Sequence, residues 1–290
     1  MQDISVIVTD LDNTLYDWFE MWYTSFNRML SSLVNQSGIR QDILEKEIHQ
    51  VFQRHGTSEY EFLIQELPSL RIKHPGEDLI KIYAPAIQAY RNARLETYHL
   101  YPTVLDTLKI LKEIGCLITG YTESRSCYTL LRVKKLKLDG LLDFLYTPPD
   151  HDIPSSQRKI YNLDKYKTTE TIHRHTRENE LKPNPILLKG IISEIGAKPE
   201  ETIYIGDSLM KDIQMAQQAK VKDVYAKYGA SQNLKAYELL RRVSHWPDKD
   251  VKLEEKEFCR FGKINPNYIL NNKFSEILDL FNFVHKKRRG

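Results

Sequence analysis

Short apolar segments alternate with helix-patterned segments through the second half of the chain. The predicted strands cover residues 116–121, 144–147, 202–206 and 222–229. The segments between them repeat apolar residues at the spacing of an α-helix. A last strand and a last helix are predicted at 267–272 and 274–284. Residues 4–9 form an earlier apolar run, of the kind that is buried on both faces of a parallel sheet. This alternation predicts an α/β fold built on a doubly wound, Rossmann-like parallel sheet.

Between the first strand and residue 101 the chain carries almost no strand signal. Apolar residues recur there at helical spacing, over 18–34, 40–56, 58–67 and 76–95. Pro85 interrupts or kinks the last of these helices. We therefore predict two domains. A helical domain, 17–100, is inserted into an α/β core that comprises residues 1–16 and 101–290 and has its own insertions near 148–180 and 231–262.

The composition is that of an ordinary globular protein, with 41% hydrophobic and 28% charged residues. A formal net charge of +3 over 290 residues is too small to indicate a nucleic-acid or membrane partner. No segment has the apolar length of a membrane span, and the first residues lack the pattern of a signal peptide. Cys116, Cys127 and Cys259 are too scattered for a disulfide framework or a zinc site. We therefore expect a cytoplasmic protein with reduced thiols.

Polar side chains follow the predicted strands at one edge of the expected sheet. Seven residues stand at such positions: Asp10, Asp12 and Thr14 after the first strand, Thr122 after strand 116–121, Lys182 before the helix that starts near residue 185, and Asp207 and Asp212 after strand 202–206. Loops that follow parallel strands converge at the carboxyl edge of an open α/β sheet, where such proteins bind their ligands. We therefore expect these side chains to form one site.

The set is chemically coherent as a site for phosphoryl transfer. Several carboxylates that converge on one point need a cation, and oxygen ligands without His or Cys favour Mg²⁺. Asp10 would be the nucleophile and form an aspartyl-phosphate, while Asp12 would protonate the leaving oxygen and later activate water. Lys182 would neutralise charge and orient the nucleophile. The predicted phosphate-binding residues are Asp10, Thr14, Thr122 and Lys182, and the predicted metal-site residues are Asp10, Asp12, Asp207 and Asp212.

Some of these assignments leave alternatives open. Thr119 and Ser124 are neighbouring hydroxyls that compete with Thr122 for the position at the strand end. Asp212 is either a metal ligand through water, a partner of Lys182, or only a carboxylate that favours the dipole at a helix N-terminus. His173 and His175 suggest a metal site, but no third ligand stands nearby, so exposed loop histidines are the better interpretation.

The order of these segments resembles that of the haloacid-dehalogenase-like (HAD) superfamily. Four segments resemble the four motifs of that family in the same order: "DLDNTLY", "LITGYT", "KPNP" and "GDSLMKD". The helical block 17–100 stands where that family inserts caps of the C1 type. The resemblance implies that Mg²⁺ is held by the side chains of Asp10 and Asp207 and by the main-chain carbonyl of Asp12. It also implies a cap that opens and closes over the site.

The leading hypothesis is therefore a Mg²⁺-dependent phosphatase that acts on a small phosphorylated metabolite. Asp12 argues against dehalogenation, because a halide leaving group needs no proton. For phosphonate hydrolysis the helical domain singles out no lysine for a Schiff base. A phosphotransferase or phosphomutase of the same family, acting on a nucleotide or sugar phosphate, is the enzymatic alternative. A non-catalytic binding protein with this fold is a further alternative, against which the presence of Asp10, Asp12, Lys182 and Asp207 argues.

Overall fold

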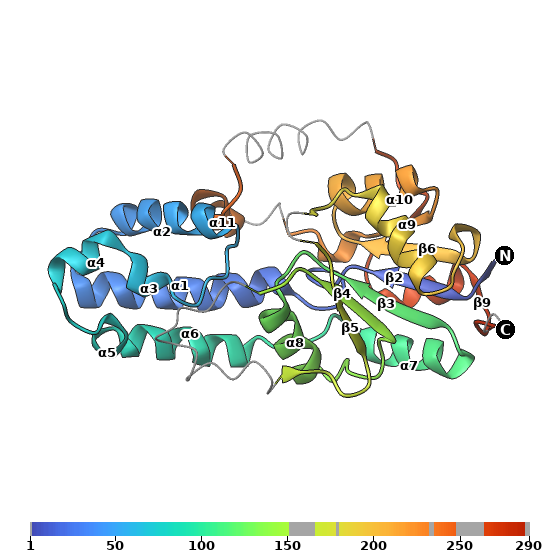
Figure 1. The fold of residues 1–290 in the computed structure, drawn as a ribbon, viewed down its shortest axis with the longest axis horizontal. Coiled ribbons are helices and arrows are strands. Elements are labelled where there is room, and N and C mark those ends of the chain that lie inside the picture. The colour runs from blue at the N-terminus through green and yellow to red at the C-terminus, as the bar shows by residue number, and fades with distance from the viewer. Residues whose placement is uncertain (1, 151–165, 178–179, 232–234, 248–263, 288–290) are drawn as a thin grey trace. The chain divides into compact units, whose positions relative to one another are not determined.

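The computed structural model describes residues 2–150, 166–177, 180–231, 235–247 and 264–287 (Figure 1). The chain divides into two compact units. The first comprises residues up to 17, 98–230 and from 264 onward; the second comprises 18–97 and the described residues between 231 and 247. Parts of both predicted insertions, 151–165 and 248–262 with Cys259, lie outside the described residues, as do Arg288 and Arg289.

The first unit is built on a sheet of seven parallel strands in the order β5-β4-β3-β2-β6-β7-β8. The strands are β2 (Val6–Thr9), β3 (Leu117–Tyr121), β4 (Phe144–Thr147), β5 (Ile172–His175), β6 (Thr202–Gly206), β7 (Lys222–Ala226) and β8 (Tyr268–Leu270). A separate parallel pair joins β1 (Asp3–Ile4) to β9 (Asn282–Phe283). The predicted α/β fold is confirmed.

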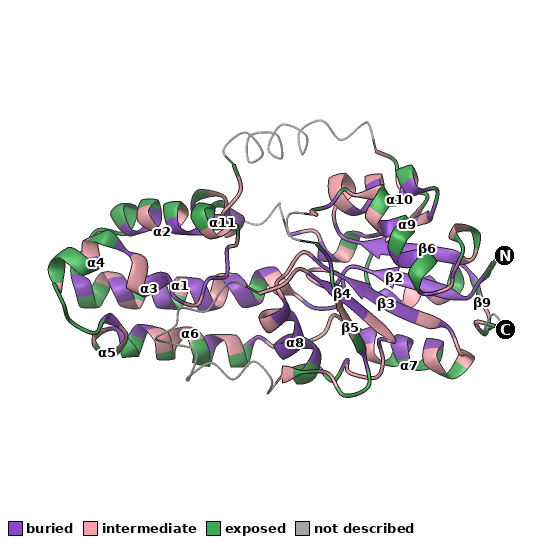
Figure 2. Ribbon diagram, viewed as in Figure 1, coloured by how far each residue is buried: buried purple, intermediate pink, exposed green. Residues whose placement is uncertain are grey.

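Helices cover both faces of this sheet. Val6 and Val8 of the central strand pack with Tyr204 of β6 against α9 (Pro185–Glu194) and α10 (Gln214–Ala219). Figure 1 shows α7 (Val104–Ile114) and α8 (Ser126–Lys135) on the opposite side of the sheet. Every residue of β2 is buried, as the purple strands in Figure 2 show. A strand buried on both faces has no polar alternation, which explains its continuous apolar sequence.

The second unit is helical, as predicted. Its helices are α1 (Trp18–Ser37), α2 (Gln41–His55), α3 (Leu63–Glu66), α4 (Pro68–Lys73), α5 (Leu79–Ile82), α6 (Ala84–Glu96) and α11 (Tyr237–Val243). Helix α1 packs against α2 and α6. Its Trp22 and Phe26 are buried, with ring centroids 4.8 Å apart. Pro85 lies in the first turn of α6, where its missing N–H breaks no helical hydrogen bond, so the predicted helix 76–95 divides into α5 and α6.

Helix α11 corrects the predicted domain assignment. Residues 231–262 were assigned to the core as an insertion, but the described part of this segment belongs to the second unit. The ring of Tyr237 lies 5.2 Å from that of Phe19 in α1, and Arg242 Nε lies 2.7 Å from a carboxylate oxygen of Glu45 in α2. The sequence of this segment is charged and irregular, and it indicates neither the helix nor the distant helices that α11 packs against.

Two more segments differ from the prediction. Within the predicted loop 148–180, residues Ile172–His175 form β5, an edge strand whose first and last residues are exposed. The predicted helix 274–284 is a 3₁₀ helix that ends at Asp279, and the chain then extends into β9. There the N–H of Val284 donates to the carbonyl of Ile4 (2.9 Å), so pairing with β1 replaces the last helical turn.

The described cysteines, Cys116 and Cys127, form no disulfide. Cys116 is buried, and burial raises the pKa of its thiol to about 11, so this thiol stays protonated at neutral pH. No helix in the described part of the chain is long and apolar enough to cross a membrane.

Candidate active site

The loop after β2 holds Asp10 and Asp12 in a fixed shape. The N–H of Asp10 donates to a carbonyl of β6 (2.8 Å), which ties the end of β2 to the neighbouring strand. Asn13 adopts a left-handed conformation (φ 55°), which Asn tolerates better than most residues. The hydroxyl of Thr14 donates to Asp10 Oδ2 (3.5 Å), and the carbonyl of Thr14 accepts a hydrogen bond from the hydroxyl of Tyr228 (2.7 Å).

Asp10, Asp207 and Asp212 form an acidic cluster at the carboxyl edge of the sheet. Their exposed fractions are only 6%, 8% and 2%, and one carboxylate oxygen from each lies within 4.8 Å of the others. Asp207 follows the end of β6, and Asp212 lies in the π-helical turn η3 (Leu209–Ile213). A Cβ atom on Gly206 would lie 2.3 Å from Cγ of Asp212, so glycine is required for Asp212 to approach the strand end.

Lys182 is buried against this cluster. Its ammonium group donates to Asp10 Oδ1 and to Asp212 Oδ1 (2.9 Å), and its side chain is only 3% exposed. The rings of Tyr121 and Tyr204 flank the ammonium at 4.9 and 5.6 Å. The hydroxyl of Tyr204 also donates to Asp212 Oδ1 (2.8 Å). The sequence prediction included Lys182 and Asp212 but missed the two tyrosines, which it counted only as strand residues.

The charges of the acidic cluster do not balance. Burial raises the pKa of Asp10 to about 8 against the attraction of Lys182, and the charges of Asp212 and Asp12 contribute to the rise. Burial, with repulsion from Asp212 and Asp10, raises the pKa of Asp207 well above its usual range. Burial disfavours the charged form of Lys182, but the two carboxylates that it contacts raise its pKa above normal. Three carboxylates and one ammonium therefore fit a further cation.

The carboxylate of Asp12 is not part of this cluster. Its Oδ2 accepts hydrogen bonds from the hydroxyls of Thr122 (3.3 Å) and Ser124 (2.5 Å), and Arg132 Nη1 lies 3.4 Å from its Oδ1. The hydroxyl of Thr122 also accepts the N–H of Ser124 (3.0 Å). Of the two hydroxyls that competed with Thr122, Ser124 therefore reaches Asp12, whereas Thr119 is buried within β3.

A family model for haloacid dehalogenase-like hydrolases matches residues 4–220. The matched segment contains the whole acidic cluster, Asp12 and Lys182. The chain belongs to this family. As a HAD-like hydrolase it is an enzyme of the hydrolase class, and the predicted resemblance is confirmed at the level of the superfamily.

The chain is also similar to individual proteins and, in its fold, to solved structures. The chain is 25% identical over 232 residues to the glyceraldehyde 3-phosphate phosphatase of Methanopyrus kandleri, covering 80% of this chain and 87% of that protein. It is 28% identical over 253 residues to pyrophosphatase PpaX of Bacillus pumilus, covering 86% and 92%. The HAD-hydrolase YfnB from Bacillus subtilis (TM-score 0.52, 15% identity, 97% of this chain and 100% of that one) shares the fold. So does a 2-haloacid dehalogenase from Pseudomonas syringae (0.53, 16%, 96% and 99%).

A second ion pair at the same edge of this HAD-like core was missed from the sequence. Glu123 accepts the N–H of Lys182 (2.6 Å) and a hydrogen bond from Lys211 Nζ (2.7 Å). Although burial opposes it, the attraction of the two lysines lowers the pKa of Glu123. Glu123 directly follows Thr122, and Lys211 lies within "GDSLMKD". Both therefore lie in or beside motif segments, but the sequence alone did not indicate what either residue does.

The histidines of β5 make hydrogen bonds to hydroxyl groups. His173 Nε2 lies 2.9 Å from the hydroxyl of Thr147, and His175 Nδ1 lies 3.3 Å from that of Ser126. Burial, together with His175, lowers the pKa of His173 to about 4, so this imidazole is neutral at pH 7. Within the described ranges, the acidic cluster is the one group of potential metal ligands close enough to share an ion.

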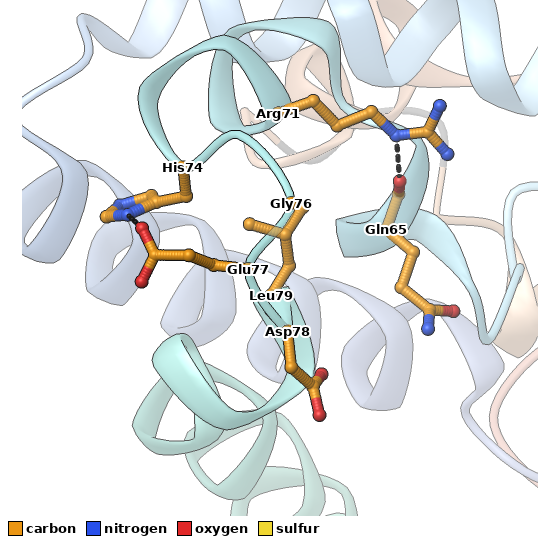
Figure 3. Close-up of a pocket in the computed structure, with 7 residues that line it drawn as sticks. All are labelled: Gln65, Arg71, His74, Gly76, Glu77, Asp78 and Leu79. Carbon is orange, nitrogen blue, oxygen red and sulfur yellow. Dashed lines mark hydrogen bonds and ion pairs between the residues drawn. The ribbon is translucent and has the colours of Figure 1, made fainter.

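The second unit contains a separate pocket of about 330 Å³ that is not part of the acidic cluster (Figure 3). Its polar groups pair with one another: Arg71 Nε donates to the carbonyl of Gln65 (2.5 Å), and His74 Nδ1 lies 3.1 Å from a carboxylate oxygen of Glu77. The acidic cluster belongs to the first unit, so this pocket contains none of the predicted site residues.

Proposed function

We propose that this protein is a Mg²⁺-dependent phosphatase that hydrolyses a small phosphomonoester through an aspartyl-phosphate on Asp10. The observation that carries the proposal is the buried acidic cluster that surrounds Lys182, with the separate carboxylate of Asp12 two residues from the nucleophile. A phosphomonoester is strongly anionic, and a site with one buried ammonium and a bound cation matches its charge.

The acidic cluster is suited to hold the metal ion. Its ligands are all oxygens, which favours a hard cation such as Mg²⁺, and the family resemblance adds the main-chain carbonyl of Asp12. A bound cation would lower the raised pKa values of Asp10 and Asp207, because positive charge favours the ionised carboxylates. When bound, the metal supplies positive charge to the phosphoryl oxygens in the transition state.

In the first half-reaction, a carboxylate oxygen of Asp10 attacks phosphorus and the bond to the leaving oxygen breaks. The carboxyl group of Asp12 gives its proton to that oxygen, and the alcohol departs. In the second half-reaction, Asp12 takes a proton from water, which attacks phosphorus and releases phosphate from Asp10. Lys182 orients Asp10 throughout. We further propose that Thr14 and Thr122 contact the phosphoryl group.

Asp12 favours a phosphatase over a dehalogenase within the family. A halide departs without a proton, whereas an alkoxide needs one, so a carboxyl group at this position has a use only in the phosphatase reaction. The names of two relatives, a glyceraldehyde 3-phosphate phosphatase and a pyrophosphatase, support phosphate-releasing chemistry here. Phosphomonoesters of small metabolites are therefore the substrates to test first.

The proposal is tested by measuring phosphate release from a panel of phosphorylated metabolites with excess MgCl₂ and with EDTA. We expect turnover only with the metal, and loss of about 10⁴-fold or more in Asp10→Asn, because the nucleophile is removed. Asp106→Asn changes an exposed aspartate of α7 and serves as the matched control, with unchanged rates expected.

Two outcomes would contradict the proposal. Phosphate release by Asp10→Asn at the wild-type rate would show that Asp10 is not the nucleophile. Isomerisation of a sugar phosphate without release of phosphate would instead identify a phosphomutase.

A further inference from the structure

Arg132 is a buried arginine that the proposed mechanism does not use. It lies on α8, with a side chain only 1% exposed, among the largest fully buried side chains of the described residues. Removing a guanidinium group from water costs several kcal/mol unless a counter-charge compensates it. The counter-charge here is Asp12, at 3.4 Å from Arg132 Nη1.

Three groups from one segment of chain hold the carboxylate of Asp12. Arg132 faces Oδ1, and the hydroxyls of Thr122 and Ser124 donate to Oδ2. Arg132 Nη1 also lies 3.5 Å from the hydroxyl of Ser124, so arginine, serine and carboxylate form a closed triangle. Each oxygen of Asp12 therefore has a donor that fixes it, and rotation of the carboxylate would break at least one of these contacts.

The guanidinium itself is fixed by aromatic rings. Its central carbon lies 6.0 Å from the ring centroid of Tyr16 and 5.8 Å from that of Tyr128. Such faces attract cations and exclude water, which strengthens the attraction between Arg132 and Asp12. Arg132 thus pairs with Asp12, whereas Lys182 pairs with Asp10 and Asp212 of the acidic cluster.

We propose that Arg132 is a positioning residue that acts through Asp12 and orients this carboxyl group for proton transfer. This inference rests on the proposed function, because it needs Asp12 to be the acid and base of a phosphatase. In the first half-reaction the proton passes from Asp12 to the leaving oxygen as the P–O bond breaks. In the second it passes from water back to Asp12 as the bond from phosphorus to Asp10 breaks. Arg132 exchanges no proton and acts only on the geometry of the carboxyl group.

This role has a signature that a merely structural arginine lacks. Proton donation matters most for leaving groups that are poor without it, such as an alkoxide, and least for nitrophenolate. A residue that acts through Asp12 should therefore affect alkyl phosphates more than p-nitrophenyl phosphate. A residue that only stabilises the fold should lower both rates by the same factor.

The experiment compares kcat/KM, which covers the steps up to departure of the leaving group, for p-nitrophenyl phosphate and for the best alkyl phosphate of the panel in Arg132→Met. This variant keeps the length of the side chain but removes its charge. We expect a loss of about 10- to 100-fold on the alkyl phosphate. On p-nitrophenyl phosphate we expect a loss within about threefold. In the Asp12→Asn background, Arg132→Met should cause no further selective loss. Lys112→Met, which removes a lysine paired with Asp143 before β4, is the matched control and should affect neither substrate.

Each outcome decides the inference. An equal loss on both substrates, or an undiminished selective loss in the Asp12→Asn background, overturns the role of Arg132 while the phosphatase proposal stands. Absence of phosphatase activity in the wild-type protein overturns both. If Arg132→Met fails to fold, Ser124→Ala removes the hydroxyl that links Arg132 to Asp12. It should show the same selectivity at a smaller size, and an unselective effect overturns the inference.

Discussion

Aspartates lie at both edges of the same sheet, but the groups that neutralise or hydrogen-bond their carboxylates differ between the two edges. At the carboxyl edge, buried Lys182 pairs with Asp10 and Asp212 of the acidic cluster, and Asp207 lies close to both carboxylates. At the amino edge, Asp139 and Asp143, here called the amino-edge aspartates, stand before β4. Asp139 accepts backbone N–H groups of Thr169 (2.8 Å), Glu170 (3.2 Å) and Thr171 (2.9 Å).

The pKa values show the contrast. Burial opposes ionisation of Asp139, but the N–H groups that it accepts hold its pKa at about 2. In the acidic cluster burial dominates, and the pKa of Asp10 rises to about 8. Donors and acceptors match at the amino edge, so those carboxylates stabilise the fold by themselves. At the carboxyl edge a positive charge is missing, which is what a site for a cation and an anionic substrate requires.

Of the substitutions considered, Lys182→Met should cause the largest loss of stability and activity. It removes the one ammonium from a buried cluster of carboxylates, and loss of one partner of a buried ion pair costs about 3–5 kcal/mol. Phosphate release should fall by about 10³-fold, since an electrostatic donor at the transition state is lost. Urea denaturation and single-turnover rates measure the two effects. Wild-type stability in this variant would mean that the cluster does not depend on Lys182.

Asp207→Asn should separate function from stability at this edge. A carboxylate with a raised pKa costs folding free energy at all pH values above its ordinary pKa of 3.8, and the cost disappears below that value. The metal-free variant should therefore unfold at a higher temperature than the metal-free wild type at pH 7. Its activity should fall by about 10²-fold at a fixed concentration of Mg²⁺, because a predicted ligand is lost.

Thermal melts with EDTA and with excess MgCl₂ make this measurement. Mg²⁺ should raise the melting temperature of the wild type and raise that of Asp207→Asn less. An equal stabilisation of both proteins by Mg²⁺ would contradict the assignment of Asp207 to the metal site.

Most of the carboxyl edge could be predicted from the sequence. Asp10, Lys182 and Asp207 lie in loops next to strands or helices, and Asp212 lies in the turn that follows Asp207. In a parallel sheet the segments that follow the strands meet at one edge, so these side chains lie close together. Each motif can be read from a short segment of sequence, and the convergence of loops at the carboxyl edge holds for parallel sheets in general. The roles of these residues remain proposals, whereas their proximity is observed.

The partners of Asp12 could not be predicted in the same way. Arg132 is followed by Lys134 and Lys135 on a helix, so it has the sequence context of a surface charge, and only packing shows it to be buried. Strand β5 was missed because an edge strand lacks the continuous apolar sequence of a central one. Helix α11 was assigned to the wrong unit because its partners stand almost 200 residues away in the chain, as the separation of Arg242 from Glu45 shows.

Asp139→Ala, at the amino edge, should lower the stability of the protein without changing its activity. It removes the acceptor of three backbone N–H groups, a loss of about 2 kcal/mol. Because the folded pKa is lowered, this stabilisation is fully present above the ordinary value of 3.8 and is lost as pH falls through about 2. The difference in urea midpoint from the wild type should be constant from neutral to mildly acidic pH and then narrow. A difference that grows on acidification would contradict this account.

Lys112→Met should have the smallest effect, and it sharpens what the amino edge contributes. Lys112 Nζ lies 2.6 Å from Asp143 Oδ1, but both side chains are 30% exposed, and such pairs contribute at most about 1 kcal/mol. Asp143 Oδ2 still accepts the N–H of Ile118 (2.8 Å) in the variant, so its carboxylate keeps a partner. The difference in urea midpoint should shrink at high salt, which screens exposed charges. A loss as large as that of Asp139→Ala, and insensitive to salt, would mean that charge pairing rather than backbone N–H donation satisfies the amino-edge aspartates.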